Sequence, residues 1–405
     1  MERAAWTSCS SASLISIFLF VYFFCLIEPS FVYGVPQSNE GLCSLIVRPM
    51  GYPCTEYIVQ TEDGYLLTLQ RISNGRSALR GYNGPPVFLQ HGLFQGGDTW
   101  FLNSVDESLG FILADHGFDV WVGNVRGTRW SSKHITLSEH ERAFWDWSWQ
   151  DLAQYDLAAM LSYVQTETNS KVLYIGHSQG TIMALAAFTM PDMVKMVEAS
   201  ALLCPISYLD HISSNFVLRA VSMHLDQMLL SLGIHQLNFR SKIGVEIMDS
   251  LCDGHVDCGN LLGAITGDNC CFNASRVEYY LEYEPHSSST KNLHHLFQMI
   301  RKGTFAKYDF GWWENLKHYH SLHPPAFNLG DIPESLPLWI GYGGNDALAD
   351  LTDLKRTIKE LKSKPEQLYI ESYGHIDFVF SVKAKDDVYG DLIRFLRSRG
   401  RSTSY

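Results

Sequence analysis

Gly176-His177-Ser178-Gln179-Gly180 is the stretch of this 405-residue chain that decides its fold. The apolar segment 172–175 precedes it, and the segment 181–187, rich in small residues, follows it. This order predicts a buried strand that passes through a tight turn into a helix. The turn strains the serine backbone, and the flanking glycines leave the room that it needs. We therefore predict a nucleophile elbow that holds the Ser178 hydroxyl out at the head of a helix.

The head of a helix stabilises a developing negative charge, because its free N–H groups and its positive end lie there. By itself, G-x-S-x-G occurs by chance in about one chain in ten of this length. An acyl-transfer site also needs a base near the serine, a group that orients the base, and donors for an oxyanion. These further parts decide between a chance match and a catalytic serine.

Segments suited to strands alternate with helical segments along most of the chain. At the start, segments 57–61 and 65–69 flank Asp63-Gly64, which predicts an antiparallel hairpin. The alternation after it predicts an α/β fold, with a mostly parallel sheet covered by helices on both faces and the hairpin at its edge. The further strands are expected at 87–90, 120–124, 172–175, 199–203, 338–342 and 367–370, with helices such as 151–165 and 351–361 between them.

The interval 207–333 breaks this alternation, because it contains no clear strand and shows helical spacing instead. An insertion of this length is too long for a loop. We expect a helical cap over the carboxyl edge of the sheet, with a lid at about residues 230–267. Its apolar face would pack on the core or line a hydrophobic substrate channel. The core itself would comprise residues 35–206 and 334–405. The apolar positions that show the spacing are Val217, Val221, Leu225, Met228, Leu232, Ile243, Ile247 and Leu251.

An acid and a histidine follow the last two predicted strands. In sheets of this type the order along the chain is serine, then Asp or Glu, then His, each just after a strand. Segment 338–342 leads to Asp346, and segment 367–370 leads to His375. This order predicts Ser178 as the nucleophile, His375 as the general base and Asp346 as the group that orients the base.

Other residues compete for these roles. The chain contains sixteen histidines, and His375 is selected by its place after the last strand. His177 lies inside the elbow and is expected to point away from the serine hydroxyl. Asp350 and Asp353 are expected to open the next helix, and Asp377 is too close to His375 in sequence to orient it.

Two backbone N–H groups are predicted to form the oxyanion hole. One belongs to the residue after the nucleophile, which is Gln179. The other comes from the loop after the third strand, where His91-Gly92-Leu93 follows segment 87–90, and we assign it to Leu93.

The N-terminus predicts a secretory signal peptide, residues 1–34. Arg3 precedes an apolar run at 14–27, which is too short to span a bilayer comfortably, and cleavage is expected after Gly34. An uncleaved anchor is the alternative, and no later segment is long and apolar enough to be transmembrane. The net charge of −12 argues against binding to nucleic acid and gives no attraction to anionic membranes.

The cysteines that remain after signal cleavage predict disulfides, because a secreted chain usually oxidises clustered cysteines. Four of them lie between residues 252 and 271, which allows three pairings. A zinc site is disfavoured there, since no C-x-x-C spacing occurs. Cys204 is expected in a buried strand, and the sequon at Asn273 predicts glycosylation. The candidate disulfide cysteines are Cys43, Cys54, Cys252, Cys258, Cys270 and Cys271.

With these residues in place, the chain resembles the acid lipases of the α/β-hydrolase superfamily, which include gastric and lysosomal acid lipases and plant triacylglycerol lipases. The similar stretches run in order from near residue 43 almost to the C-terminus. Asn269-Cys270-Cys271-Phe272-Asn273 looks most like the plant branch. The stretches are Gly51-Tyr52-Pro53, Thr61-Glu62-Asp63-Gly64-Tyr65, Leu89-Gln90-His91-Gly92-Leu93, 119–127, 144–149, 176–180, 343–350 and 373–378.

The resemblance implies an α/β-hydrolase fold with a lidded cap, the triad Ser178, Asp346 and His375, and the oxyanion donors Leu93 and Gln179. It implies hydrolysis of acylglycerols or sterol esters without a metal or other cofactor. The lid disulfide of the animal enzymes is not carried over, because the cysteine pattern differs. We expect a secreted or vacuole-like location and a lipid substrate at an oil–water or membrane interface. The alternatives are a short-chain esterase or acyltransferase on the same triad, and an inactive lipid-binding protein.

Overall fold

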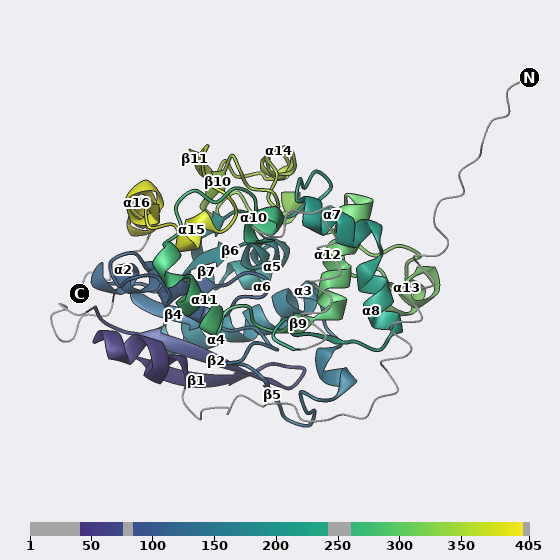
Figure 1. The fold of residues 1–405 in the computed structure, drawn as a ribbon, viewed down its shortest axis with the longest axis horizontal. Helices are drawn as coiled ribbons and strands as arrows, with labels where there is room; N and C mark the ends of the chain where they lie inside the picture. Colours follow the sequence, from purple (N-terminus) through teal and green to yellow (C-terminus); the bar gives the residue numbers. More distant parts are fainter. Residues whose placement is uncertain (1–40, 76–83, 242–260, 400–405) are drawn as a thin grey trace, which may run out of the picture. The chain divides into compact units, whose positions relative to one another are not determined.

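The computed structural model describes residues 41–75, 84–241 and 261–399, all within one unit, Glu40–Tyr405 (Figure 1). The expected signal peptide 1–34 lies outside the described residues. So do Cys252 and Cys258 and half of the expected lid, residues 242–260. Among the described residues, no helix combines the length and apolar character that crossing a bilayer requires.

One mixed sheet forms the core of this unit, in the order β1-β2-β4-β3-β6-β7-β10-β11, with β5 paired to β2. β2 runs antiparallel to β1, β4 and β5, whereas neighbouring strands from β4 to β11 are parallel. The predicted α/β fold with a hairpin at the sheet edge is confirmed. The strands are β1 (Thr55–Gln60), β2 (Tyr65–Ile72), β3 (Pro86–Gln90), β4 (Asp119–Gly123), β5 (Lys133–His134), β6 (Val172–His177), β7 (Val197–Leu203), β10 (Leu338–Gly343) and β11 (Glu366–Ile370).

Helices connect these strands, as expected for parallel pairs. The α-helices of the core are α2 (Leu109–Asp115), α3 (Trp149–Asp151), α4 (Leu157–Thr168), α5 (Gln179–Ala187), α6 (Pro191–Val194), α14 (Leu351–Glu360), α15 (Asp377–Phe380) and α16 (Gly390–Arg399). Shorter 3-10 and π-helical turns are η1 (Cys43–Val47), η2 (Arg48–Met50), η3 (Gly97–Phe101), η4 (Arg142–Trp145), η5 (Leu152–Asp156) and η9 (Lys385–Tyr389).

One face of the sheet is covered by α4 and α5. Phe88 stands in register with both Trp121 and Tyr174, so the three side chains share a face. The Trp121 ring contacts Tyr163 of α4, with 6.2 Å between ring centroids. The Tyr174 hydroxyl donates to the carbonyl of Gly180 in α5 at 2.6 Å.

The opposite face is covered by η3, α2 and α16. Val122 follows Trp121 in β4, so its side chain lies on the opposite face of the sheet. A Cβ on Gly97 of η3 would meet Val122 on that face. Trp339 shares this second face through the register of β10, β7, β6, β3 and β4. Its indole N–H donates to Asp391 of α16 at 2.9 Å. The predicted cover on both faces is therefore present.

Between β7 and β10 the regular elements of the described chain are mostly helices, and the boundaries 207 and 333 of the cap stay a prediction. The expectation that this interval lacks strands is wrong, because β8 and β9 form a two-residue antiparallel pair. Strands this short leave no alternating pattern in a sequence. The elements are α7 (Asn215–Ser222), α8 (Leu225–Ser231), β8 (Gln236–Leu237), α10 (Leu261–Thr266), η7 (Ala274–Arg276), α11 (Val277–Tyr283), β9 (Ser288–Ser289), α12 (Thr290–Lys302), α13 (Trp312–Tyr319) and η8 (Leu329–Asp331).

The helical spacing of positions 217–232 corresponds to two helices. His224 has a φ of 51°, in the left-handed region, and separates α7 from α8. Apolar side chains of α7, α8 and α12 bury one another in a small cluster that includes Phe216, Leu229 and Phe297. Part of the apolar surface of these helices is thus buried among themselves. The positions Ile243, Ile247 and Leu251 lie outside the described residues.

Two disulfides involve described cysteines. Cys43 bonds to Cys54, with 5.4 Å between their Cα atoms, and joins η1 to the start of β1. Cys270 bonds to its neighbour Cys271. Cys204 is buried and free, and it directly follows β7 rather than lying within it.

A buried ion-pair cluster joins the hairpin turn to the helical layer. Arg126, with 1 % of its side chain exposed, lies 2.5 Å from Asp63 in the turn and 2.5 Å from Asp156 of η5. The Asp156 side chain is fully buried, so without Arg126 its charge would have no counter-ion.

We expect Arg126→Met to destabilise the fold by about 3–5 kcal/mol, because it leaves the buried Asp156 carboxylate unpaired. Urea unfolding measures the loss. The exposed pair between Lys195 and Asp192 provides the control, and Lys195→Ala should leave the unfolding midpoint in place. Equal midpoints for the Arg126 variant and wild type would contradict the assignment.

Candidate active site

Ser178 stands between the end of β6 and the start of α5, with φ 53° and ψ −117°. A positive φ is unfavourable for a residue with a side chain, and the surrounding structure must hold it. A Cβ on Gly176 would lie 3.0 Å from the Gly180 backbone, and one on Gly180 would lie 2.6 Å from the carbonyl oxygen of Gln90. Both elbow positions therefore have room only for glycine.

The three side chains selected from the sequence lie in one hydrogen-bonded row. His375 Nε2 is 2.7 Å from Ser178 Oγ. His375 Nδ1 is 2.8 Å and 3.0 Å from the two carboxylate oxygens of Asp346. All three residues are buried, and each comes from the loop that follows a strand: β6, β10 and β11.

Asp346 is held as a carboxylate. Burial would raise its pKa, but the neighbouring His375 and the backbone N–H groups of Ala349 and Leu348 outweigh burial, so the pKa is lowered. Both N–H groups donate to Oδ1 at 2.8 Å. An ionised Asp346 accepts the Nδ1 proton of His375, which leaves Nε2 free to take the proton of the serine hydroxyl.

The backbone of His375 is fixed by residues that the sequence did not indicate. Its N–H donates to the carbonyl of Thr266 at 3.1 Å. Its carbonyl accepts from the Cys204 thiol at 3.2 Å and lies 2.9 Å from His177 Nε2. Burial lowers the pKa of His177 to about 3, so this second imidazole stays neutral. Its ring nitrogens lie 3.0 Å from Gln95 Oε1 and 2.9 Å from the His375 carbonyl oxygen, so both are engaged by groups other than the serine hydroxyl.

The rival acids take other positions. Asp350 caps α14, where its carboxylate accepts the N–H of Thr352 at 2.6 Å, and Asp353 lies in the first turn of that helix. Asp377 accepts the backbone N–H groups of Gly374 at 2.8 Å and Cys270 at 3.0 Å. Asp377 therefore ties the His375 loop to the disulfide Cys270–Cys271.

The two predicted oxyanion donors lie beside the serine. The N–H of Gln179 is the first of α5, so it has no acceptor within the helix. The loop after β3 passes against the nucleophile, since a Cβ on Gly92 would lie 3.0 Å from Ser178 Cβ. Within the described part of the chain, the next N–H, that of Leu93, donates to no backbone or side-chain group.

The segment between β7 and β10 reaches this site through α12. Asn292 is buried at the start of that helix, and its side-chain amide donates to Gln179 Oε1 at 2.7 Å. The side chain of Gln179 is thereby anchored to α12 while its N–H stays at the head of α5.

Side chains that can bind metal ions gather at three places among the described residues. At two of them the imidazole is already engaged, because both ring nitrogens of His375 and of His286 make hydrogen bonds. These two groups are therefore hydrogen-bonded networks as they stand. The three groups are Cys204, Asp346 and His375; Asp98, Glu284 and His286; and Asp210, His211 and Asp353.

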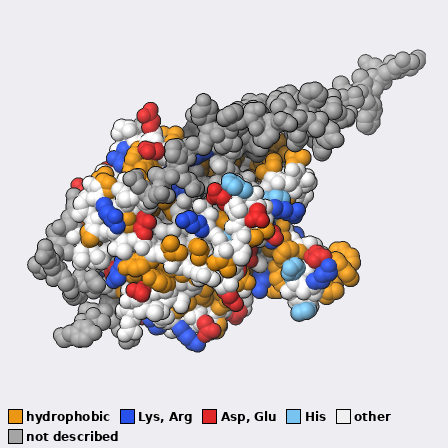
Figure 2. Space-filling view, turned by 90° about the horizontal axis from the view of Figure 1, so that it is seen from below, with side chains coloured by type: hydrophobic (Ala, Val, Ile, Leu, Met, Phe, Trp, Pro, Cys, Tyr) orange, Lys and Arg blue, Asp and Glu red, His pale blue; other side chains and the backbone are white. Residues whose placement is uncertain are grey.

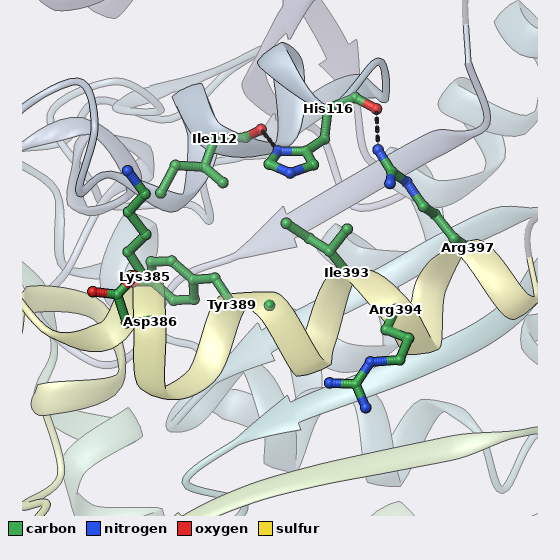
Figure 3. A pocket seen from close by; sticks show the side chains of 9 residues that line it. Ile112, His116, Lys385, Asp386, Tyr389, Ile393, Arg394 and Arg397 are labelled. Atoms are coloured by element: carbon green, nitrogen blue, oxygen red, sulfur yellow. Dashed lines mark hydrogen bonds between the residues drawn. The ribbon is translucent and has the colours of Figure 1, made fainter.

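A surface cavity of about 390 Å³ lies elsewhere, between α2 and the pair η9 and α16 (Figure 3). In it, Arg397 donates to the carbonyl of His116 at 3.1 Å. The triad residues do not line this cavity, so we assign it no catalytic role. Its lining includes Ile112, His116, Lys385, Tyr389, Ile393 and Arg397.

Comparisons with known proteins agree with this geometry. Residues 43–104 match the family model described as a partial alpha/beta-hydrolase lipase region, and residues 85–232 match that of the alpha/beta hydrolase fold. Triacylglycerol lipase 1 of Arabidopsis thaliana is 59 % identical over 383 residues, covering 95 % of this chain and 96 % of the relative. Human lysosomal acid lipase/cholesteryl ester hydrolase is 34 % identical over 370 residues, covering 89 % and 92 %.

A solved structure of a monoglyceride lipase from Saccharomyces cerevisiae resembles the chain in fold. The TM-score is 0.55 at 14 % identity, over 85 % of this chain and 95 % of that one. At this identity the likeness concerns the fold alone.

The close approach of Gly180 to the Gln90 carbonyl predicts how a larger residue at the elbow would affect stability. We expect Gly180→Ala to destabilise the fold by about 1–3 kcal/mol, because the added methyl group overlaps the Gln90 carbonyl. Gly390 is the control: a Cβ there meets nothing within 4 Å, and φ is −62°. Gly390→Ala should leave stability equal or higher by up to about 1 kcal/mol. Denaturant unfolding measures the stability of both variants. A Gly180→Ala variant as stable as wild type would contradict the prediction.

Proposed function

The chain belongs to the acid lipase family of α/β hydrolases, and on that premise we propose that it hydrolyses the ester bonds of acylglycerols to free fatty acids. The observation that carries the proposal is the row Ser178–His375–Asp346, with hydrogen bonds of 2.7 Å and 2.8 Å. The relative with 59 % identity, named triacylglycerol lipase 1, supports the substrate class.

In the first half of the reaction, Ser178 Oγ attacks the ester carbonyl carbon while His375 Nε2 takes the hydroxyl proton. The carbonyl oxygen becomes an oxyanion, which we assign to the N–H groups of Leu93 and Gln179. Asp346 holds the Nδ1 proton and stabilises the imidazolium. The tetrahedral intermediate collapses, the alcohol leaves with the Nε2 proton, and the acyl group stays on Ser178.

In the second half, a water molecule takes the place of the alcohol. His375 Nε2 accepts a proton from the water as its oxygen attacks the acyl carbon, and the same N–H groups bind the second oxyanion. Collapse returns the proton to Ser178 Oγ and releases the fatty acid. This sequence uses only residues of the chain and water.

We also propose that the enzyme meets its substrate at an oil–water or membrane interface. Exposed apolar side chains on and after α13 support this: Trp312 is 66 % exposed, Trp313 54 % and Leu322 53 %. Figure 2 shows hydrophobic side chains gathered on a lobe at the side where Figure 1 places α13. Tryptophan favours the boundary between an apolar and a watery phase, because one end of it is apolar and the other polar.

For the location, we propose entry into the secretory pathway after removal of residues 1–34, and a secreted or vacuole-like destination. The disulfide Cys43–Cys54 supports an oxidising compartment. At the proposed glycosylation site, Asn273 Oδ1 accepts the Ser275 hydroxyl at 2.7 Å.

Sterol esters are a second substrate class, favoured by the relative that is named a cholesteryl ester hydrolase at 34 % identity. Rates on emulsified triolein, cholesteryl oleate and soluble p-nitrophenyl esters separate the two classes. They also distinguish a lipase from a short-chain esterase.

Ser178→Ala should reduce fatty-acid release from triolein by roughly 10⁴- to 10⁶-fold, because it removes the nucleophile. It should also abolish labelling by a fluorophosphonate probe, which reacts only with an activated serine. Ser398→Ala, an exposed serine on α16, is the matched control and should keep wild-type activity. Substantial triolein hydrolysis by Ser178→Ala would refute the proposal.

Asp346→Asn should lower kcat by about 10³- to 10⁴-fold, because an amide no longer fixes the His375 tautomer. The pH dependence of stability should change as well. The lowered pKa of Asp346 contributes stability above its unfolded pKa of about 3.9, and this is lost as pH falls through the folded value. Thermal unfolding between pH 2 and pH 6 should therefore show a weaker acid loss in the variant. An unchanged kcat would exclude the role of Asp346.

A further inference from the structure

A second buried group of acids and a histidine lies outside the triad. It consists of Asp98 at the start of η3 and of Glu284 and His286 in the cap segment between α11 and β9. The side chains of His286 and Asp98 are fully buried, and that of Glu284 is 13 % exposed. The mechanism above does not use these residues, so their burial calls for another explanation.

The group holds the loop that carries Leu93. The backbone N–H of His286 donates to the carbonyl of Phe94, the residue after Leu93, at 2.7 Å. The N–H of Gly96 donates to Glu284 Oε1 at 3.3 Å, and the Thr99 hydroxyl makes a short hydrogen bond to the same oxygen. The segment that carries Glu284 and His286 is thus hydrogen-bonded to the loop on the carboxyl side of Leu93.

The fit at Gly96 is close enough to fix the path of the loop. A Cβ at this position would lie 2.5 Å from His286 Nε2, so the imidazole rests directly on the loop backbone. Phe94 itself has a φ of 59°, a left-handed conformation that a non-glycine residue keeps only when its surroundings hold it. The bond from His286 to the Phe94 carbonyl is one such restraint.

The hydrogen bonds of His286 define its protonation. The backbone N–H of Arg129 donates to Nδ1 at 3.1 Å, so Nδ1 carries no proton. Nε2 therefore carries it and donates to both carboxylate oxygens of Asp98, each at 3.0 Å. This imidazole joins the loop after β4, the start of η3 and the segment between α11 and β9.

Glu284 takes the neutral form in this setting. Burial and the nearby Asp98 carboxylate raise its pKa to about 8, and its second oxygen, Oε2, has no hydrogen-bond partner among the described residues. Below that pH Glu284 adds no negative charge beside the Asp98 carboxylate. The other titratable groups that face the cluster are His91, Arg129, Arg240, Tyr279 and Tyr283.

We propose that Asp98, Glu284 and His286 form a positioning cluster that places the Leu93 N–H for the oxyanion by clamping its loop to the cap. The proposal rests on the function proposed above, since it needs Leu93 as a donor. An oxyanion donor acts over a narrow range of distance, about 2.7–3.1 Å. A loop freed at Phe94 and Gly96 would leave that range, and the loss would appear in the transition state rather than in substrate binding.

The test compares kcat and KM on soluble p-nitrophenyl butyrate. His286→Ala should lower kcat roughly 10- to 100-fold, with KM within about threefold of wild type. His286→Gln should recover part of the loss, because its amide N–H can reach Asp98. The control is His294→Ala, which breaks a partly buried His–Asp pair between α12 and α8 without removing any hydrogen bond of the loop, and should keep wild-type kcat.

Variants of Glu284 provide a second measurement, the pH dependence of kcat, which would not change if Glu284 had only a structural role. Glu284→Ala should lower kcat, and Glu284→Gln should recover it, because an uncharged amide replaces an uncharged carboxyl. In wild type, ionisation of Glu284 puts a second negative charge beside Asp98, so kcat should fall as pH rises through about 8. This alkaline fall should be weaker in Glu284→Gln, which cannot ionise.

The outcomes separate the two proposals. If wild type hydrolyses the ester and His286→Ala is equally fast, the positioning cluster is excluded while the triad stands. Equal pH profiles for wild type and Glu284→Gln would exclude the role of Glu284. If wild type neither hydrolyses the ester nor reacts with a fluorophosphonate, the proposed function itself fails. Should His286→Ala not fold, His286→Gln and Glu284→Gln decide the question.

Discussion

The hydrogen bond between Ser178 and His375 joins positions 197 residues apart, and the rest of the site is arranged to make it possible. The elbow places the serine at an unfavourable φ, which persists only because β6, α5 and two glycines surround it. His375 meets the serine because its backbone is fixed on both sides: its N–H binds Thr266 and its carbonyl faces Cys204 and His177. The strained backbone of Ser178 and the restrained backbone of His375 are both needed for this one hydrogen bond.

Much of this arrangement could be read from the sequence. Runs of apolar residues between helical segments predict a parallel sheet, and G-x-S-x-G marks one turn of it. The chain order of Ser178, Asp346 and His375 follows from where strands end, so three distant residues could be selected without coordinates. Asp350 was separable from Asp346 because an aspartate directly before a helix is a common cap.

Other features left no local pattern. The partners Asp98 and His286 are 188 residues apart, and neither belongs to a recognisable motif. Thr266 and Cys204 act on His375 through a backbone carbonyl and a thiol, which any periodicity analysis treats as ordinary positions. The helix break at His224 and the two-residue strands β8 and β9 also lack a local sequence signal. What the sequence conceals is the contact between cap and core.

That contact limits how the protein can be divided. The side-chain amide of Asn292, at the base of α12, binds Gln179, whose own N–H heads the helix after the nucleophile. A chimera that exchanged the cap with that of another lipase would therefore transplant part of the catalytic scaffold as well. Chimera junctions placed in the connections to β7 and β10 would separate Asn292 from Gln179, the two residues that form this hydrogen bond. The helices between β7 and β10 and the sheet core of this enzyme therefore have to be exchanged together, because they are not interchangeable modules.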